Sequence, residues 1–153
     1  MNRMTANRAI RGSSLVEVLV TMIIIALGLL GQASLMAVSS KANNAAFLRS
    51  QATLLSYDIL ERMRLNRALA VAGNFTSAAS VQSSDITGDD IDKQELRDWK
   101  ARVEQALPSG EASITVDADG NASIEIQWSE IAKGSESDDG SIDPTTFKTF
   151  SAI

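Results

Sequence analysis

A run of uncharged, mostly apolar residues near the N-terminus constrains this chain more than any other feature. From Val18 to Ser40 no residue is charged, and Val18 to Leu30 consists almost entirely of Ile, Leu, Val, Met and Ala. A helix of about 20 such residues spans the hydrocarbon core of a bilayer. The sequence therefore predicts a single membrane-spanning helix.

A single carboxylate, Glu17, stands directly before this run. A charge within a membrane segment costs roughly 2.5 to 3.5 kcal/mol on translocon scales, so such a residue indicates a function and a partner. We expect an amine as the partner, because a charge-assisted pair is strong in a low dielectric while either member alone is heavily penalised. A local interpretation, compatible with the first, is a capping box in which Ser14 and Glu17 each bind a free backbone N–H.

The residues before Gly12 include three basic side chains and no acidic one, namely Arg3, Arg8 and Arg11. A basic leader stays on the cytoplasmic side, so the rest of the chain is expected outside. The alternative is a secretory signal peptide, in which Gly31-Gln32-Ala33 resembles a cleavage site. Glu17 argues against it, as does an apolar stretch that outlasts the roughly 7 to 15 residues usual in signal peptides.

Gly12 followed by Ser-Ser-Leu-Val-Glu-Val-Leu-Val resembles the class III leader junction of type IV prepilins and secretion pseudopilins. The resemblance implies that an inner-membrane aspartyl peptidase cuts between Gly12 and Ser13 and then methylates the new amine of Ser13. It also implies that Glu17 forms an assembly salt bridge with the terminal amine of a neighbouring subunit. Ser13 departs from the family pattern, which usually has phenylalanine at this position.

The helix is expected to continue beyond the membrane, because no proline or polar, glycine-rich cluster interrupts the chain between Ser13 and Ala72. Its outer half is predicted to be amphipathic and to cover the chain's own head, because apolar residues recur there at helical spacing. These residues are Leu48, Ala52, Leu55, Ile59 and Met63. Asp58 and Arg62 are expected to pair one turn apart. Gly73 and Asn74 supply the stop signal.

A second helix is predicted after a surface loop at 74–90. We expect Asp92 to begin it, with Glu95 completing a capping box and Ile91 packing against Leu96. Its apolar face consists of Leu96, Trp99, Val103, Ala106 and Leu107. Pro108 ends it, because the residue before a proline is driven away from helical geometry.

Two strands are then predicted at 112–116 and 122–128, where apolar residues alternate, with an Asp-Gly hairpin turn between them. A Thr- and Phe-containing segment at the C-terminus is expected to add a third strand. The fold class is therefore α+β, with a long N-terminal helix packed on a small antiparallel-sheet head that has one extra helix.

Four segments follow from these patterns. They are a basic leader at 1–12, the transmembrane and assembly half of the helix at 13–40, its amphipathic half at 41–73, and an acidic globular head at 74–153. From residue 68 onward the chain has 16 acidic and six basic residues, a formal charge of −10. Nucleic acid affinity depends on neutralised phosphates, so we expect no direct nucleic acid binding.

The stalk at 41–67 has five basic and two acidic residues, a formal charge of +3. Two interpretations stay open for Arg62, Arg64 and Arg67. They either meet anionic neighbours or lipid head groups, or form a solvated helix face.

A calcium-loop pattern begins at Asp117, Asp119 and Asn121, but it is incomplete. Ala122 stands where the loop needs glycine and Trp128 where it needs a bidentate glutamate, which excludes an EF-hand. The acidic loop at 138–143 is either a looser calcium site or a set of solvated turn carboxylates.

The chain contains no histidine and no cysteine. Cys/His metal sites, thiol catalysis, histidine triads and a disulfide in the C-terminal loop are therefore excluded. We expect no enzyme activity, no cofactor and no metal.

A closer resemblance covers most of the chain. The stalk from Arg49 to Arg67 resembles that of PilV-type minor pilins. The helix with Trp99 that ends in Leu107-Pro108-Ser109-Gly110, and the hairpin that ends in Trp128, are similar to that group's head. The resemblance implies a low-abundance subunit that primes assembly of a type IV pilus and lies at its tip.

The implied partners are other minor pilins, the major pilin, the prepilin peptidase, the inner-membrane assembly machinery and, before assembly, the lipid bilayer. The implied location is the inner membrane with the head in the periplasm, and after assembly the pilus at the cell surface. Two alternatives are a minor pseudopilin of a type II secretion system and a membrane-anchored or secreted periplasmic binding domain. The mature N-terminus separates the classes: Met1 for an uncleaved anchor, Ser34 for a conventional signal peptide and Ser13 for a prepilin.

Overall fold

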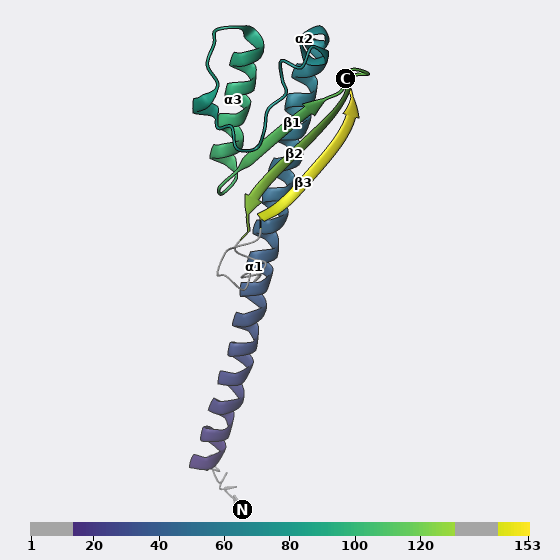
Figure 1. The fold of residues 1–153 in the computed structure, drawn as a ribbon. Coiled ribbons are helices and arrows are strands. Elements are labelled where there is room, and N and C mark those ends of the chain that lie inside the picture. Colours follow the sequence, from purple (N-terminus) through teal and green to yellow (C-terminus); the bar gives the residue numbers. More distant parts are fainter. Residues whose placement is uncertain (1–13, 131–143) are drawn as a thin grey trace, which may run out of the picture. The chain divides into compact units, whose positions relative to one another are not determined.

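The computed structural model describes residues 14–130 and 144–153. Its elements are α1 (Leu15–Leu65), α2 (Arg67–Val71), the short 3-10 helix η1 (Ser83–Asp85), α3 (Ile91–Ala106), β1 (Glu111–Val116), β2 (Asn121–Ser129) and β3 (Pro144–Ala152), as Figure 1 shows. The chain divides after Ser40 into two compact units. A long N-terminal helix, a small antiparallel sheet and further helices confirm the expected α+β class.

The first unit contains the N-terminal turns of α1, and none of its described residues is buried. Every residue from Ser14 to Ser40 is exposed. A Cβ added at Gly28 or Gly31 would meet no atom within 4 Å. The conformation of this part is a plain helix whose side chains all face outward.

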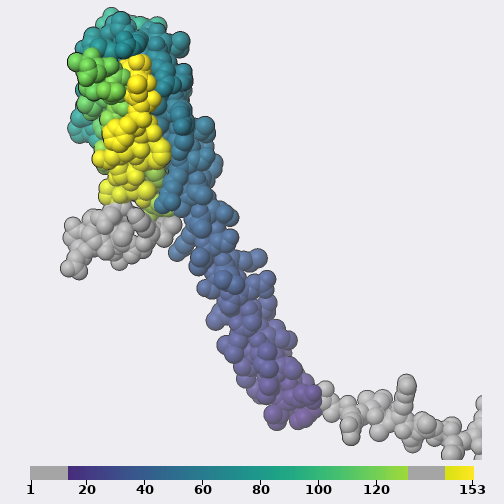
Figure 2. Space-filling view, turned by 90° about the vertical axis from the view of Figure 1, so that its right-hand side faces the viewer, coloured from purple at the N-terminus to yellow at the C-terminus, as the bar shows by residue number. Residues whose placement is uncertain are grey.

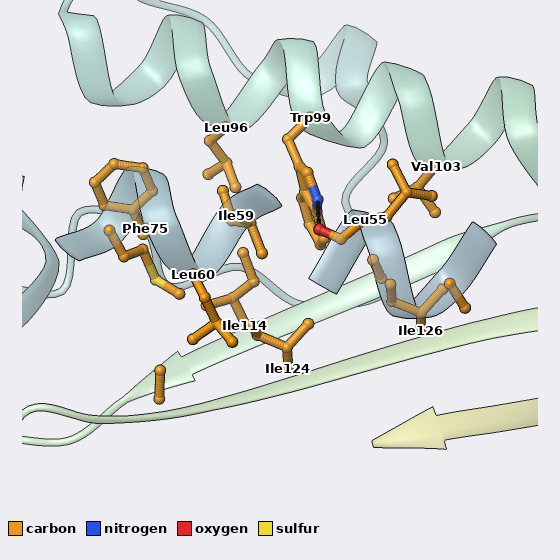
Figure 3. Close-up of a cluster of buried hydrophobic side chains, with 14 of the residues drawn as sticks. Leu55, Ile59, Leu60, Phe75, Leu96, Trp99, Val103, Ile114, Ile124 and Ile126 are labelled. Atoms are coloured by element: carbon orange, nitrogen blue, oxygen red, sulfur yellow. Dashed lines mark hydrogen bonds between the residues drawn. The ribbon is translucent and has the colours of Figure 1, made fainter. Parts of the chain in front are cut away.

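The second unit has one hydrophobic core to which α1, α3 and the sheet contribute. The predicted stripe of α1 is buried in full, at Leu48, Ala52, Leu55, Ile59 and Met63. In Figure 3, Leu96, Trp99 and Val103 of α3 point toward α1 from one side, and Ile114, Ile124 and Ile126 of the strands point toward it from the other. The indole Nε1 of Trp99 donates a hydrogen bond to the Leu55 carbonyl over 2.8 Å. This bond fixes α3 on the outer half of α1.

The sheet has the order β1-β2-β3 with both pairs antiparallel. Ile114 lies opposite Ile124, and Ser123 lies opposite Phe150. Alternate residues of β2 are buried against the helices, and the residues between them form the outer face. The Asp-Gly turn has Gly120 at φ +87°, a conformation that glycine adopts without strain. The hairpin and the third strand are both confirmed.

The predicted continuation of α1 to residue 73 is wrong at its end. The helix stops at Leu65, and Asn66 adopts φ −116° and ψ 42° before α2 begins. The Asn66 side chain donates to the Glu95 carboxylate of α3 over 3.3 Å. Asparagine side chains compete with regular helix geometry, and here a tertiary partner favours the break. The stop at Gly73 is confirmed, with φ +85°.

The predicted start of α3 is also wrong. The helix begins at Ile91 with Asp90 as its N-cap, and the Asp90 carbonyl accepts from the Gln94 N–H. The capping box does not form, because a helix with Asp90 as its N-cap has Glu95 two residues beyond the third helical position that the box requires. The Glu95 carboxylate accepts from Asn66 instead. Ile91 remains 60% exposed, while Leu96 is buried in the core. The predicted end is confirmed, because Ala106 is the last helical residue and Leu107 is extended.

Candidate functional site

The N-terminal turn of α1 positions the residues that the sequence singled out. The backbone N–H groups of Glu17 and Val18 both donate to the Ser14 carbonyl, over 2.9 and 3.2 Å. Within the described residues, no hydrogen bond joins the side chain of Ser14 or Glu17 to the backbone of the other, so the capping box considered above does not form. Glu17 lies in the first turn, where a negative charge is favourable with the helix dipole.

Thr21 stands one turn further along, on the same helix. Its hydroxyl donates toward the carbonyls of Glu17, over 2.9 Å, and of Val18, over 2.8 Å. A polar side chain that bonds to its own helix does not need water or another subunit as a partner. Glu17 is exposed, and its side chain has no hydrogen-bond or ion-pair partner among the described residues.

The apolar side chains around Glu17 are all exposed. Among those from Leu15 to Val38 that the structure places on the surface, the exposed fraction runs from 47% at Val18 to 82% at Leu15. Among the described residues, one helix is long and apolar enough to cross a membrane, and none of its most apolar stretch is buried within the chain. Burial of apolar surface is worth about 25 cal/mol per Å². This surface therefore needs lipid or another protein to cover it.

The structure thus defines an α+β protein with an exposed apolar helix, at whose start the Glu17 side chain has no hydrogen-bond or ion-pair partner among the described residues. Residues 7–31 match the family model of the prokaryotic N-terminal methylation motif. This match spans the end of the basic leader, the junction at Gly12 and Ser13, and Glu17. It supports a type IV pilin-like protein that is processed by a prepilin peptidase and anchored in the membrane. Searches of curated proteins and of solved structures found no match to the chain.

Gly12 and Ser13 lie outside the residues that the structure describes. Cleavage between them, methylation of Ser13 and the salt bridge of Glu17 therefore stay predictions that rest on the sequence. The acidic loop at 138–143 also lies outside the described residues.

Three arginines of the stalk bind groups of their own chain, which the sequence indicated for Arg62 but not for Arg64 or Arg67. Arg62 Nε lies 3.3 Å from the Asp58 carboxylate, as the pair predicted one turn apart. Arg64 pairs with Glu61 and donates to the Ser151 hydroxyl over 2.9 Å. Arg67 donates to the Ile153 carbonyl over 2.8 Å. These bonds join the end of α1 and the start of α2 to the last residues of β3 and its flank.

The hairpin residues that match the start of a calcium loop form hydrogen bonds within their own turn. Asp117 accepts hydrogen bonds from the backbone N–H groups of Asp119 and Asn121 and from the Asn121 side chain. The bond from the Asn121 side chain contributes most to lowering the pKa of Asp117, so this carboxylate stays ionised. Within residues 14–130 and 144–153, no group of three or more acidic side chains is arranged to hold a metal ion.

A buried lysine in α3 is a feature that the sequence analysis missed. Lys100 is only 2% exposed, and its ammonium donates to the carbonyls of Ala78 and Val81. Burial lowers its pKa, while Glu104 and two further carboxylates partly oppose that effect. Glu104 in turn accepts from the backbone N–H and the hydroxyl of Ser83. Lys100 lies four residues after Leu96 and three before Val103, so helical spacing alone was a signal for its buried position.

Proposed function

We propose that this chain is a minor pilin of the PilV type, a structural subunit that helps prime assembly of a type IV pilus and lies at its tip. The observation that carries the proposal is the exposed apolar half of α1 with Glu17 at its start, inside a segment that matches the methylation motif. The fold supports it, because a small acidic head on the amphipathic half of the same helix suits a filament subunit. The function is structural and involves no turnover.

The mechanism follows from the charge and the apolar surface. Cleavage after Gly12 frees the amine of Ser13 and makes Glu17 the fifth residue of the mature chain. In an apolar environment the Glu17 carboxylate is stabilised by pairing with the amine of a neighbouring subunit, and each charge alone is strongly destabilised. The pair therefore selects the subunit register in which both charges are satisfied. The apolar side chains pass from lipid to protein without exposure to water.

Location and partners follow from the same proposal. Before assembly the chain is anchored in the inner membrane with its head in the periplasm. After assembly it lies in the pilus at the cell surface, in contact with other minor pilins and the major pilin.

The first experiment is the intact mass and N-terminal sequence of the protein, isolated from membranes of cells with and without the prepilin peptidase. The proposal predicts a peptidase-dependent start at Ser13 with a methyl group on the amine. A start at Met1 or at Ser34 in both strains contradicts it and indicates an uncleaved anchor or a conventional signal peptide.

The role of Glu17 is tested by Glu17→Ala. We expect processing to continue and the amount of the protein in sheared pili to fall sharply, because the amine of the neighbour loses its partner. Glu61→Ala is the matched control, since it removes an exposed carboxylate from the same helix without touching the apolar half. Normal incorporation of Glu17→Ala would refute the pairing.

The minor pseudopilin alternative shares the same motif and predicts a different phenotype. A strain that lacks this gene should lose surface pili if the proposal holds. Loss of protein secretion with normal piliation would instead assign the chain to a type II secretion system.

A further inference from the structure

A hollow on the outer face of the sheet has the size of a small-molecule site. It has a volume of about 580 Å³ and lies where β1 and β2 meet their hairpin and where β3 ends. Known ligand pockets range from about 300 to 1,000 Å³. The residues that line it with functional side chains are Thr115, Asp117, Asn121, Ser123, Phe150 and Ser151. Figure 2 shows β3 (yellow), the strand that carries Phe150, on the surface of the second unit.

Phe150 is the unusual member of this set, because its ring is 75% exposed. The strand register places it in one row with Ser123 and Thr115 across the outer face. The next row holds Ser113, Glu125 and Lys148, which are all polar. A lone aromatic ring on a polar face is not a hydrophobic docking patch, which would be larger and contiguous. It is instead a small apolar platform whose ring face attracts the partial positive charge of C–H groups.

The polar groups beside the ring are held in place before any ligand arrives. Asp117 accepts from the N–H groups of Asp119 and Asn121 over 3.0 and 2.7 Å, and from Asn121 Nδ2 over 2.8 Å. Asp117 is also exposed, so its carboxylate stays accessible to a ligand. Within the described residues, the hydroxyls of Thr115 and Ser123 have no hydrogen-bond partner. The rim thus offers one fixed, ionised acceptor and two free hydroxyls.

The charge of the lining selects the ligand. Asp117 is the one charged residue that lines the hollow, and no basic side chain does so. Arg64 reaches Ser151 from α1, but its charge is paired with Glu61. Among the lining residues, an anionic ligand would meet the negative charge of Asp117 and no basic side chain. A neutral ligand with one apolar face and several hydroxyl groups fits both the ring and the rim.

We propose that this hollow is a binding site for a neutral saccharide, with a pyranose ring stacked on Phe150 and its hydroxyls bonded to Asp117, Asn121 and Ser123. The site lies wholly in the second unit and uses neither the leader nor Glu17. It therefore goes beyond the proposed assembly function and does not depend on it.

The test uses the full chain in micelles of a detergent that has no sugar head group, since a glycoside detergent would compete. The probes are glucose, galactose, N-acetylglucosamine and lactose, and the readouts are saturation-transfer difference spectra and backbone amide shifts. We expect at least one probe to bind with a dissociation constant on the order of 1 mM, as suits a shallow site. The amide shifts should be confined to 115–123 and 149–152.

Three variants decide whether Phe150 carries the binding. Phe150→Ala should weaken it by about tenfold or more, and Phe150→Trp should retain it. Phe47→Ala is the matched control, because it removes a ring that is 57% exposed on α1, away from the hollow, and should change nothing. The proposal is overturned if no probe saturates, if Phe150→Ala binds like the parent chain, or if only an anionic saccharide such as sialyllactose binds.

Discussion

The two halves of α1 differ in what covers them, although they belong to one helix. From Leu15 to Ser40 the side chains are exposed all round and almost all apolar or small. From Lys41 to Leu65 one face is buried in the head, and the other carries charges such as Glu61 and Arg64. A helix with one apolar stripe needs one partner, while a helix that is apolar all round must be enclosed. The chain supplies the partner for its outer half, and a bilayer or a filament must supply the enclosure for the inner half.

The largest effect is expected from Trp99→Ala, which would disrupt the packing of α3 on the outer half of α1. Trp99 is fully buried and donates to the Leu55 carbonyl. Loss of a buried tryptophan typically costs about 3 to 5 kcal/mol of the free energy of unfolding. Thermal unfolding of the full chain in micelles, followed by near-ultraviolet circular dichroism, measures this. Phe47→Ala should change little, and membrane insertion of both variants should stay normal. A Trp99→Ala head as stable as the parent would contradict the packing described here.

Ile24→Arg tests the inner half in the opposite sense. Ile24 is 63% exposed and belongs to the first unit. An arginine near the centre of a membrane helix costs roughly 2.5 to 3.5 kcal/mol on insertion scales. We expect less protein to resist alkaline extraction from membranes, while the head keeps its melting temperature. Ile24→Leu is the control. A loss of head stability instead would mean that the two units are energetically coupled.

Lys100→Met tests how the second unit stabilises a buried charge. The Lys100 ammonium is bound by backbone carbonyls of the same unit. The substitution leaves the carbonyls of Ala78 and Val81 without their donor. A buried polar group left unsatisfied costs about 1 to 3 kcal/mol. Hydrogen exchange should accelerate for the loop at 78–83, while Lys148→Met, which removes an exposed lysine, should leave that loop unchanged. Equal exchange in the two variants would show that Lys100 does not hold the loop.

The smallest effect is a loss of stability at low pH, and it too is expected in the second unit. Hydrogen bonds lower the pKa of Asp117, with the Asn121 side chain as the main donor. Hydrogen bonds also lower the pKa of Glu125, with the Lys148 side chain as the main donor. Both unfolded values are about 4. Their contribution to stability is therefore complete above that pH and is lost as the pH falls through the lower folded values. The melting temperature of the parent chain should drop more than that of Asp117→Asn between about pH 6 and pH 3. Identical pH profiles would exclude a contribution from Asp117.

Local patterns predicted much of this structure. The stripe from Leu48 to Met63 and the two strands of the Asp-Gly hairpin followed from periodicity and turn chemistry, which act within a few residues. The third strand was expected only from the Thr and Phe content of the C-terminal segment. The break at Asn66 did not, because its cause is Glu95, 29 positions away. The contacts of Arg64 and Arg67 with 151–153 were hidden for the same reason. The hollow beside Phe150 depends on the register of β2 and β3, which the sequence does not specify by itself.

The candidate site was predictable to a different degree. The apolar anchor and Glu17 could be recognised from the sequence, because a carboxylate at the start of an uncharged run is rare. The proposed partner of Glu17, the amine of a neighbouring subunit, belongs to another molecule and so lies outside a single folded chain. The processing residues Gly12 and Ser13 stay predictions for the peptidase experiment.

The Thr21 hydroxyl needs no hydrogen-bond partner outside α1. Glu17 and Thr21 are the two polar side chains between Leu15 and Leu30. Thr21 is satisfied by carbonyls of its own helix, so its hydrogen bonds travel with it from one solvent to another. The proposed movement from lipid into a protein filament would therefore leave the hydrogen bonds of Thr21 unchanged. Between Leu15 and Leu30, Glu17 is therefore the one polar side chain whose interactions would differ between lipid and a filament.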